Sequence, residues 1–407
     1  MARTLPSNTA DTERLLTKDF LVLTLSGFFA LCGFASTLPL VPRYVEGELG
    51  GGKVSVGIAV GVFSVSAIVA RPLVGRLGDE RGRRFIIVGG TALTAITVAA
   101  HALATTLPLL YLVRLAMGVT QGAFFVGSAT LVNDLAPPER RGEATNYFSV
   151  SVYGGMAIGP LFGEIVQKAS SFNIAFLAGG GSLLIASLLA TRLPADRPRA
   201  TPDPAPATER GEKQRGPGLL HPAAIVPGII LMGGLVTFTA LNGFMPLYVE
   251  ERGLGSAGSV LAVYGLLVLV MRVVGSRIPD RFGTLRTATI SLIGQAAGMA
   301  VMGFWASQYG LYAGAIVLAI GGSFLYPTLL TAAVYGVADN ERARAPSTFA
   351  LAFELSAGLG GPLLGMAAAL TDTRAAFFGA SLAALAVLPV LYTWSAKRPD
   401  ALIPPRY

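Results

Sequence analysis

Charged side chains are scarce in this chain. Asp, Glu, Lys and Arg make up 13% of its 407 residues, whereas 53% are hydrophobic. A soluble domain of this size carries about twice as much charge, which argues against a large soluble all-helical protein. The mean hydropathy is +0.61. We therefore expect an all-α membrane protein, because a lipid bilayer offers no partner to unpaired backbone groups.

Cysteine and histidine are scarce as well. The single cysteine, Cys32, excludes an internal disulfide and a paired-cysteine redox or metal site. The two histidines, His101 and His221, fall at the ends of apolar segments and form no ligand cluster. The phosphate-binding pattern G-x-x-x-x-G-K-S/T does not occur, so ATP is not expected to drive the protein. We expect no cofactor and no metal and, without a nucleophile–base set, no enzyme.

Apolar segments long enough to cross a bilayer, roughly 20 residues each, recur along the chain. The twelve expected spans are 20–42, 54–75, 85–104, 109–131, 144–167, 173–192, 222–245, 256–277, 287–306, 309–333, 346–369 and 374–395. Lys and Arg concentrate in alternate connections, as they do in cytoplasmic loops. We therefore attribute the net charge of +8 to membrane topology rather than to nucleic-acid binding, and we expect both termini in the cytoplasm.

A charged, proline-rich stretch at 193–221 is too polar to span the membrane and is expected to form a cytoplasmic linker. It separates a six-helix bundle at 20–192 from a second one at 222–395, with cytoplasmic tails at 1–19 and 396–407. The halves repeat each other. Three residues of the first half have counterparts 201 residues later, namely Arg71, Asp79 and Gly82 in Arg272, Asp280 and Gly283. The repeat predicts two pseudo-symmetric bundles with a site between them.

Three motifs carry a family resemblance. They are the turn motif Gly75, Asp79, Gly82, Arg83 and Arg84 between the second and third spans, then Arg114-x-x-x-Gly118-x-x-x-Gly122, and then Gly155-x-x-x-Gly159-Pro160-x-x-Gly163. With these motifs the chain resembles the major facilitator superfamily over essentially its whole length. The resemblance implies a twelve-helix transporter that works by alternating access. The third motif is typical of antiporter branches, although Glu164 replaces its final glycine, and Glu80 departs from the basic residue usual in the first.

Charges at the cytoplasmic ends of the spans are expected to latch the halves together. In the family, the acid at the position of Asp79 meets the N-terminal end of the eleventh helix, which begins here near Pro346. Arg83 and Arg84 are expected to pair with Asp134. Arg71 and Arg272 are expected to reach the cytoplasm and to act in the latch, as is Asp280, and anchoring of topology is the alternative for all these charges.

Charges within the spans are costly and usually face the bundle interior. Arg114, on one face with Gln121, is expected to bind an anionic substrate or to act on a nearby carboxylate, with a static ion pair as the alternative. Glu354 lies about 12 Å from the cytoplasmic end of its span and is expected to bind and release a proton as access alternates. A site for a cationic substrate and a structural pair are its alternatives. Glu164 is expected at the membrane–water interface, with a gate as the alternative.

The expected substrate cavity mixes aromatic side chains with a few polar ones, as sites for apolar ligands do. Its candidates are Phe28, Phe34, Gln121, Phe125, Asn146, Tyr153, Asn242, Tyr264, Tyr326 and Phe353, and plain helix packing is the alternative for each. The sparse polarity favours an amphiphilic or aromatic compound over a sugar.

Together these features predict a monomeric secondary transporter of the inner cell membrane that exports a small organic molecule against protons. Uptake of a small metabolite, such as a sugar or an organic acid, by symport or facilitated diffusion is the first alternative. A membrane enzyme or receptor is the second, but the sequence offers no appended signalling domain to support it.

Overall fold

The computed structural model describes residue 15 and residues 17–137, 140–194, 220–275, 278–337 and 344–398. Most of the expected linker and both chain ends lie outside these ranges. Within them, every regular element is a helix, and twelve helical segments are long and apolar enough to cross a membrane. The predicted all-α fold with twelve membrane helices is therefore confirmed.

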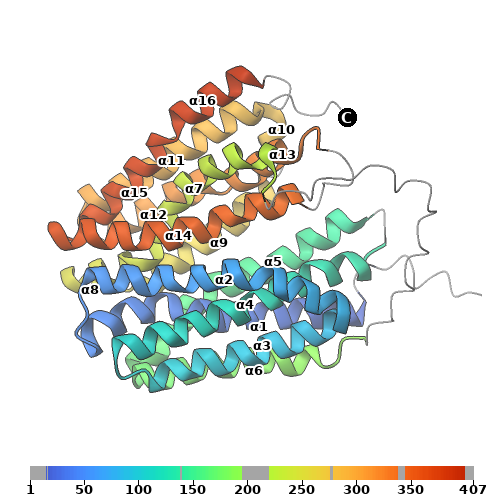
Figure 1. Ribbon diagram of the computed structural model, residues 1–407. Coiled ribbons are helices and arrows are strands. Elements are labelled where there is room, and N and C mark those ends of the chain that lie inside the picture. The colour runs from blue at the N-terminus through green and yellow to red at the C-terminus, as the bar shows by residue number, and fades with distance from the viewer. Residues whose placement is uncertain are drawn as a thin grey trace, which may run out of the picture.

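The first bundle contains six membrane segments, coloured blue to green in Figure 1. They are α1 (Lys18–Arg43) with the π-helical turn η1 (Tyr44–Glu48), α2 (Lys53–Arg81), α3 (Arg83–Ala100) with the short η2 (His101–Leu103), α4 (Leu107–Leu135), α5 (Arg141–Ala169) and α6 (Phe172–Ala190). Hydroxyl side chains begin two of these helices. Thr17 accepts a hydrogen bond from the backbone N–H of Phe20 at 3.2 Å, and Ser171 accepts one from Ile174 at 3.3 Å, which satisfies free donors at the helix starts.

The second bundle differs from the prediction because three of its spans are each split into two helices. Its elements are α7 (Pro222–Gly243) and α8 (Met245–Arg252), α9 (Ala257–Val274), the short α10 (Ile278–Phe282), α11 (Thr284–Phe304), α12 (Gln308–Gly322) and α13 (Leu325–Val334), α14 (Arg344–Leu370), and α15 (Arg374–Ala386) and α16 (Leu388–Lys397). A proline lies in the first turn of the second helix at each break, namely Pro246, Pro327 and Pro389. Proline cannot donate to the carbonyl four residues earlier, so the helix breaks there.

The charged stretch between the second and third spans is mostly helical. Helix α2 continues through Gly75 and Asp79 to Arg81, and the chain turns at Gly82 alone, whose φ is 90°. The repeated turn in the second half uses Gly283 in the same way, with a φ of 76°. Only glycine adopts this backbone region without strain, which explains why both copies keep it.

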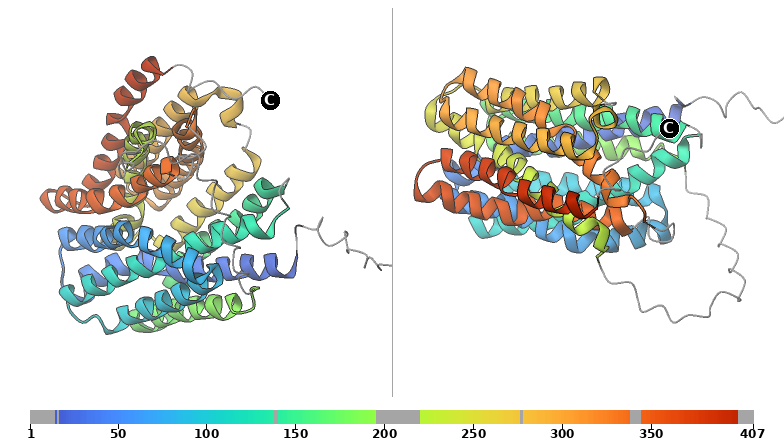
Figure 2. Two further views of the ribbon diagram at one scale, coloured as in Figure 1. Left: turned by 45° about the vertical axis from the view of Figure 1, so that its right-hand side comes forward. Right: turned by 90° about the horizontal axis from the view of Figure 1, so that it is seen from above.

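We call the end of the bundles at which α6 ends and α7 begins the linker end, and the opposite end the distal end. One apolar core at the distal end joins both bundles, with members such as Leu40 and Val56 from the first and Leu247 and Phe377 from the second. Towards the linker end it gives way to two cores, one confined to each bundle. Accordingly, the bundles lie together at the distal end and diverge towards the linker end (Figure 1; Figure 2, left).

Candidate functional site

The interface between the bundles is formed mainly by two helix pairs, α2 with α14 and α5 with α9. Small residues bring their backbones into contact in the distal half. A Cβ atom at Gly57 would lie 2.3 Å from the carbonyl oxygen of Gly361, and one at Gly265 would lie 2.9 Å from the Cα atom of Ala157. Since no side chain fits between these backbones, the helix pairs close the distal half of the interface.

The glycines of the α5 motif face α1 rather than the second bundle. Cβ atoms at Gly155, Gly159 and Gly163 would lie 2.4 to 2.6 Å from carbonyl oxygens of α1. These glycines therefore allow α1 and α5 to pack closely within the first bundle. Pro160 faces the other way, because its carbonyl oxygen would lie 2.8 Å from a Cβ atom at Gly258 of α9.

Arg114 is buried against α2, with 6% of its surface exposed. Its Nε donates to the carbonyl oxygen of Ala59 at 2.9 Å, and its guanidinium lies 5.5 Å from the centroid of the Phe63 ring. None of its described contacts is with a carboxylate. The side chain thus connects α4 to α2 within the first bundle, and its role in proton coupling or anion binding stays a prediction.

Glu354 is also buried, with 7% of its surface exposed. It lies on α14, about 15 Å along the helix from Arg344 at the linker end. The residue before it, Phe353, has its ring 5.5 Å from the ring of Tyr326 on α13. A carboxyl group at this depth, on a helix of the bundle interface, is costly to retain. Its proton-coupling role stays a prediction.

Three predicted residues of α5 and α9 come together across the interface. The guanidinium of Arg272 lies 4.6 Å from the ring centroid of Tyr153, a cation–π contact between the bundles. Tyr264 lies within electrostatic range of both residues, and its ring is 6.2 Å from that of Phe238 on α7. The Nε atom of Arg272 is buried, so we group this side chain with the cavity candidates, and its role in the latch stays a prediction.

The remaining cavity candidates are dispersed through the fold. The Phe34 ring lies 5.8 Å from that of Phe63, and Asn242 donates to the Phe238 carbonyl of its own helix at 2.8 Å. Phe28 contacts the Gly154 position. Of the other candidates, Gln121 is partly buried, whereas Phe125 and Asn146 are exposed.

At the linker end, two basic residues of the expected latch make contacts within the first bundle, and a latch between the bundles stays a prediction. Arg83 forms the predicted ion pair with Asp134, which connects α3 to α4. Arg84 donates to the carbonyl oxygen of Thr191 at the end of α6. The side chains of three further latch candidates lie outside the described part of the chain, namely those of Arg71, Asp79 and Asp280.

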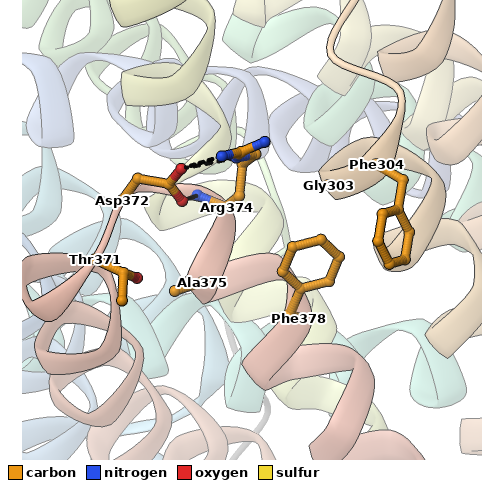
Figure 3. A pocket seen from close by; sticks show the side chains of 7 residues that line it. All are labelled: Gly303, Phe304, Thr371, Asp372, Arg374, Ala375 and Phe378. Carbon is orange, nitrogen blue, oxygen red and sulfur yellow. Dashed lines mark hydrogen bonds and ion pairs between the residues drawn. The ribbon is translucent and has the colours of Figure 1, made fainter.

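A pocket of about 510 Å³ lies at the distal end of the second bundle (Figure 3). Its lining consists of Gly303, Phe304, Thr371, Asp372, Arg374, Ala375 and Phe378. Asp372 Oδ2 and Arg374 Nη2 lie 2.6 Å apart. The hydrogen bond from Arg374 holds the pKa of the Asp372 carboxyl below its usual value. The pocket includes no predicted cavity residue and lies within one bundle, so we do not place the transport site there.

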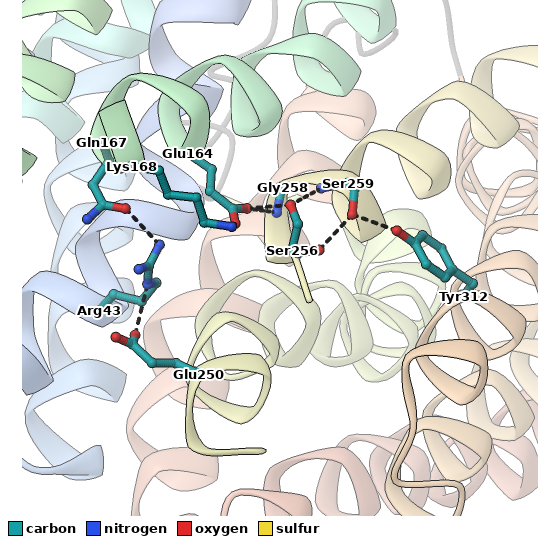
Figure 4. A network of polar contacts seen from close by, with 9 residues as sticks. All are labelled: Arg43, Glu164, Gln167, Lys168, Glu250, Ser256, Gly258, Ser259 and Tyr312. Atoms are coloured by element: carbon teal, nitrogen blue, oxygen red, sulfur yellow. Dashed lines mark hydrogen bonds and ion pairs between the residues drawn. The ribbon is translucent and has the colours of Figure 1, made fainter. Parts of the chain in front are cut away.

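The distal ends of the bundles are joined by a polar network that the sequence did not predict (Figure 4). Arg43 on α1 pairs with Glu250 on α8 at 2.8 Å. Glu164 on α5 contacts the start of α9 and is only 3% exposed, so its side chain is buried between the bundles. The signal in the sequence was the acid that replaces the final glycine of the α5 motif.

Two six-helix bundles that meet along two helix pairs define a multi-pass membrane protein of the transporter class. The family model for the Major Facilitator Superfamily matches residues 23–282 and 255–406, and the chain belongs to this superfamily. It is therefore a secondary transporter.

Relatives and solved structures agree with this assignment. The chain is 26% identical over 356 residues to an uncharacterised MFS-type transporter of Salmonella typhimurium, covering 86% of this chain and 89% of the relative. It is 27% identical to one of Burkholderia mallei, covering 92% and 93%. In fold it is similar to the nucleoside transporter NupG, with a TM-score of 0.75, 15% identity and coverage of 92% and 99%. It is also similar to a bacterial homologue of the lysosomal transporter Spinster in an inward-facing, occupied conformation, with a TM-score of 0.74, 14% identity and coverage of 95% and 98%.

Proposed function

We propose that this transporter exports a small amphiphilic organic molecule in exchange for protons by alternating access. The main support for the proposal is the buried position of Glu354. This residue provides a buried carboxyl group in a membrane segment, on the interface helix α14, and the ring of the preceding residue, Phe353, lies 5.5 Å from that of Tyr326. Because its surroundings change when the bundles move, such a group can take up a proton in one conformation and release it in the other.

The aromatic and cationic side chains between the bundles support an amphiphilic substrate. Tyr153 and Tyr264 lie near Arg272, which stands in the last turn of α9. Aromatic rings offer apolar area with a polar edge, which suits a compound that combines a ring system with a few polar groups.

The proposal includes an orientation. The linker end carries the basic loops, so we place it in the cytoplasm with both termini, and we place the distal end outside. With the distal half of the interface closed, the described conformation then corresponds to access from the cytoplasm. We further propose that the protein works as a monomer in the inner cell membrane of a bacterium.

The experiment that tests the proposal has two stages. A panel of toxic amphiphilic compounds is first tested for growth protection in a bacterial host that lacks its own pumps. The protected compound is then followed in proteoliposomes with an imposed pH gradient. We expect flux opposite to the proton gradient in the wild type. In Glu354→Gln, flux driven by the pH gradient should be lost while downhill exchange is retained, since the amide cannot carry a proton.

Glu48→Gln is the matched control, because Glu48 is an exposed carboxylate at the distal end. It should transport like the wild type. Flux in the same direction as protons would replace export by uptake, and full proton-driven flux in Glu354→Gln would remove Glu354 from the mechanism.

A further inference from the structure

A carboxylate of the first bundle lies against the first turn of a helix in the second bundle. Glu164 on α5 accepts a hydrogen bond through Oε2 from the Ser256 hydroxyl at 2.9 Å and another from the backbone N–H of Gly258. Its Oε1 lies 2.6 Å from the Nζ atom of Lys168, one turn further along α5. Figure 4 shows these groups converging between α5 and α9.

The contact has a clear electrostatic basis. The first backbone N–H groups of a helix lack partners within it, and the aligned peptide dipoles place a partial positive charge there. Ser256 is the N-cap of α9 and accepts from the N–H of Ser259 at 3.1 Å. Glu164 satisfies a further donor, that of Gly258, from the opposite bundle. At 3% exposure the carboxylate has little access to water, so these charge-assisted bonds are stronger than exposed ones.

The contact can exist only while α5 and α9 touch at their distal ends. Opening the distal end would separate Glu164 from Ser256 and Gly258, which would remove two of its three described donors and leave the Gly258 N–H without this acceptor. Lys168 stays with Glu164, because both belong to α5. Arg43 and Glu250 also connect the bundles, but the Glu250 side chain is 57% exposed, and such a pair contributes little.

The corresponding place in the other helix pair differs, because the polar contact at the start of α2 joins Lys53 Nζ to Glu251 Oε1 of α8, 2.9 Å away, and not to a group on α14. At the offset of 202 residues that relates α5 to α14, Glu164 corresponds to the apolar Met366. The start of α2, which α14 approaches there, has Gly52 as its N-cap and no side-chain cap. A Cβ atom at Gly365 would lie 2.6 Å from the carbonyl oxygen of Lys53, so that pair closes by backbone packing.

We propose that Glu164, Ser256 and Gly258 form a distal latch, in which Glu164 is a positioning residue that holds the distal end closed and must release α9 in every transport cycle. The proposal needs only alternating access. It does not depend on the substrate, the direction of transport or proton coupling. Because the carboxylate has a hydroxyl, a backbone N–H and an ammonium group as donors, it acts through its charge, and the coupling role stays with Glu354.

Spin-label distances test the latch without any substrate. In a Cys32→Ala background, labels at Ser170→Cys and Ala306→Cys would report on the distal ends of the two bundles, where both side chains are exposed. Removal of a hydrogen bond to a charged group shifts a two-state equilibrium by about tenfold or more. We therefore expect Glu164→Ala to raise the ratio of long to short distal distances at least about tenfold, in detergent and in liposomes.

A second pair of labels and a matched variant complete the design. Thr191→Cys with Lys397→Cys, at exposed linker-end positions, should show the opposite shift towards short distances. Glu250→Gln, which removes an exposed acid of the same interface, should leave both distributions unchanged. If Glu164→Ala does not fold, the same distances are measured in Glu164→Gln. Its amide keeps the size and an acceptor oxygen of the side chain but loses the charge.

A folded Glu164 variant with wild-type distances at both ends would overturn the latch. Reduced thermal stability with unchanged distances would do the same, since it would make the contact purely structural. Neither result would affect the export proposal, and failure to find proton-driven export would leave the distance experiment valid.

Discussion

At the scale of single residues, Arg114 and Glu354 are two buried charges in membrane segments of opposite bundles. Arg114 has a defined set of partners on α2, a carbonyl oxygen and an aromatic face. Glu354 lies on a helix that forms the interface between the bundles. A charge whose described partners lie in one bundle keeps that environment when the bundles move, whereas a charge on a helix that contacts the other bundle can exchange its surroundings. For this reason we assign the changing proton occupancy to Glu354 and expect Arg114 to stabilise the bundle.

Replacement of Arg114 by Ala tests that assignment. The variant loses the hydrogen bond to the Ala59 carbonyl, and loss of a bond from a charged group costs about 1.5–3 kcal/mol. We expect a lower unfolding temperature in detergent, measured by scanning fluorimetry. The unfolding temperature of Arg114→Lys should lie between those of the wild type and Arg114→Ala, since lysine keeps the charge but lacks the planar guanidinium group. An unchanged unfolding temperature combined with weaker binding of an anionic compound would instead assign Arg114 to the substrate.

The ion pair of Asp372 and Arg374 at the distal pocket predicts a defined pH dependence (Figure 3). Its hydrogen bond lowers the pKa of Asp372, so the pair stabilises the folded state above the ordinary carboxyl pKa of about 3.9. This contribution is lost as the pH falls through the lowered pKa. The side chains are 36% and 40% exposed, so solvent screening keeps the effect small.

The unfolding temperatures of the wild type and Asp372→Asn should therefore differ by a small, constant amount from pH 8 to about pH 5, and the difference should shrink below about pH 4. A difference that grows on acidification would contradict the assignment.

Residue contacts were predictable only where both partners stand at helix ends on one side of the membrane. Arg83 and Asp134 meet this condition, and they pair as expected. The partners of Glu164 in the other bundle lie 92 and 94 residues later, in a segment that begins a helix. No periodic pattern relates such positions, because their approach depends on how the two bundles dock. The contact between the Arg272 guanidinium and the Tyr153 ring could not be predicted for the same reason.

At the scale of helices, hydrophobicity predicted every membrane segment but not its internal geometry. The apolar run ends near residue 75, yet α2 continues to Arg81, because a charged surface turn of helix needs no lipid-compatible side chains. The positions of the prolines are visible in the sequence, but their effect on each helix is not. Pro246, Pro327 and Pro389 lie next to breaks, whereas Pro160 and Pro362 lie inside continuous helices. Tertiary packing decides between these outcomes, and the sequence of one helix does not contain it.

The α2–α14 pair gives a prediction at this scale. Gly57→Ala places a methyl group where the Gly361 carbonyl now lies, 2.3 Å away, so the backbones must separate at the distal end. We expect the variant to transport more slowly and to show longer distal spin-label distances.

Gly89→Ala is its matched control. A Cβ atom there meets nothing within 4 Å, and alanine is favoured over glycine within a helix by up to about 1 kcal/mol. This variant should transport normally and be at least as stable as the wild type. Equal behaviour of the two variants would show that the close approach of α2 and α14 is not required for closure.

At the scale of the whole molecule, the fold is one core at the distal end and two cores at the linker end. Alternating access requires the reverse arrangement to be accessible at a similar free energy, so each end needs contacts strong enough to close it and weak enough to break. The distal latch supplies such a contact at one end. The family resemblance assigns the same role at the other end to Asp79, which would meet the start of α14.

Two latches at opposite ends predict compensation. Glu164→Ala should favour the state that is open at the distal end, and Asp79→Asn should favour the state that is open at the linker end, with each slowing transport without preventing membrane insertion. Because the two changes bias one equilibrium in opposite directions, the double variant should return the spin-label distances towards the wild-type distribution. It should also transport faster than either single variant. Two independent structural defects would instead add, so a double variant slower than both singles would show that the acids do not act on a common equilibrium.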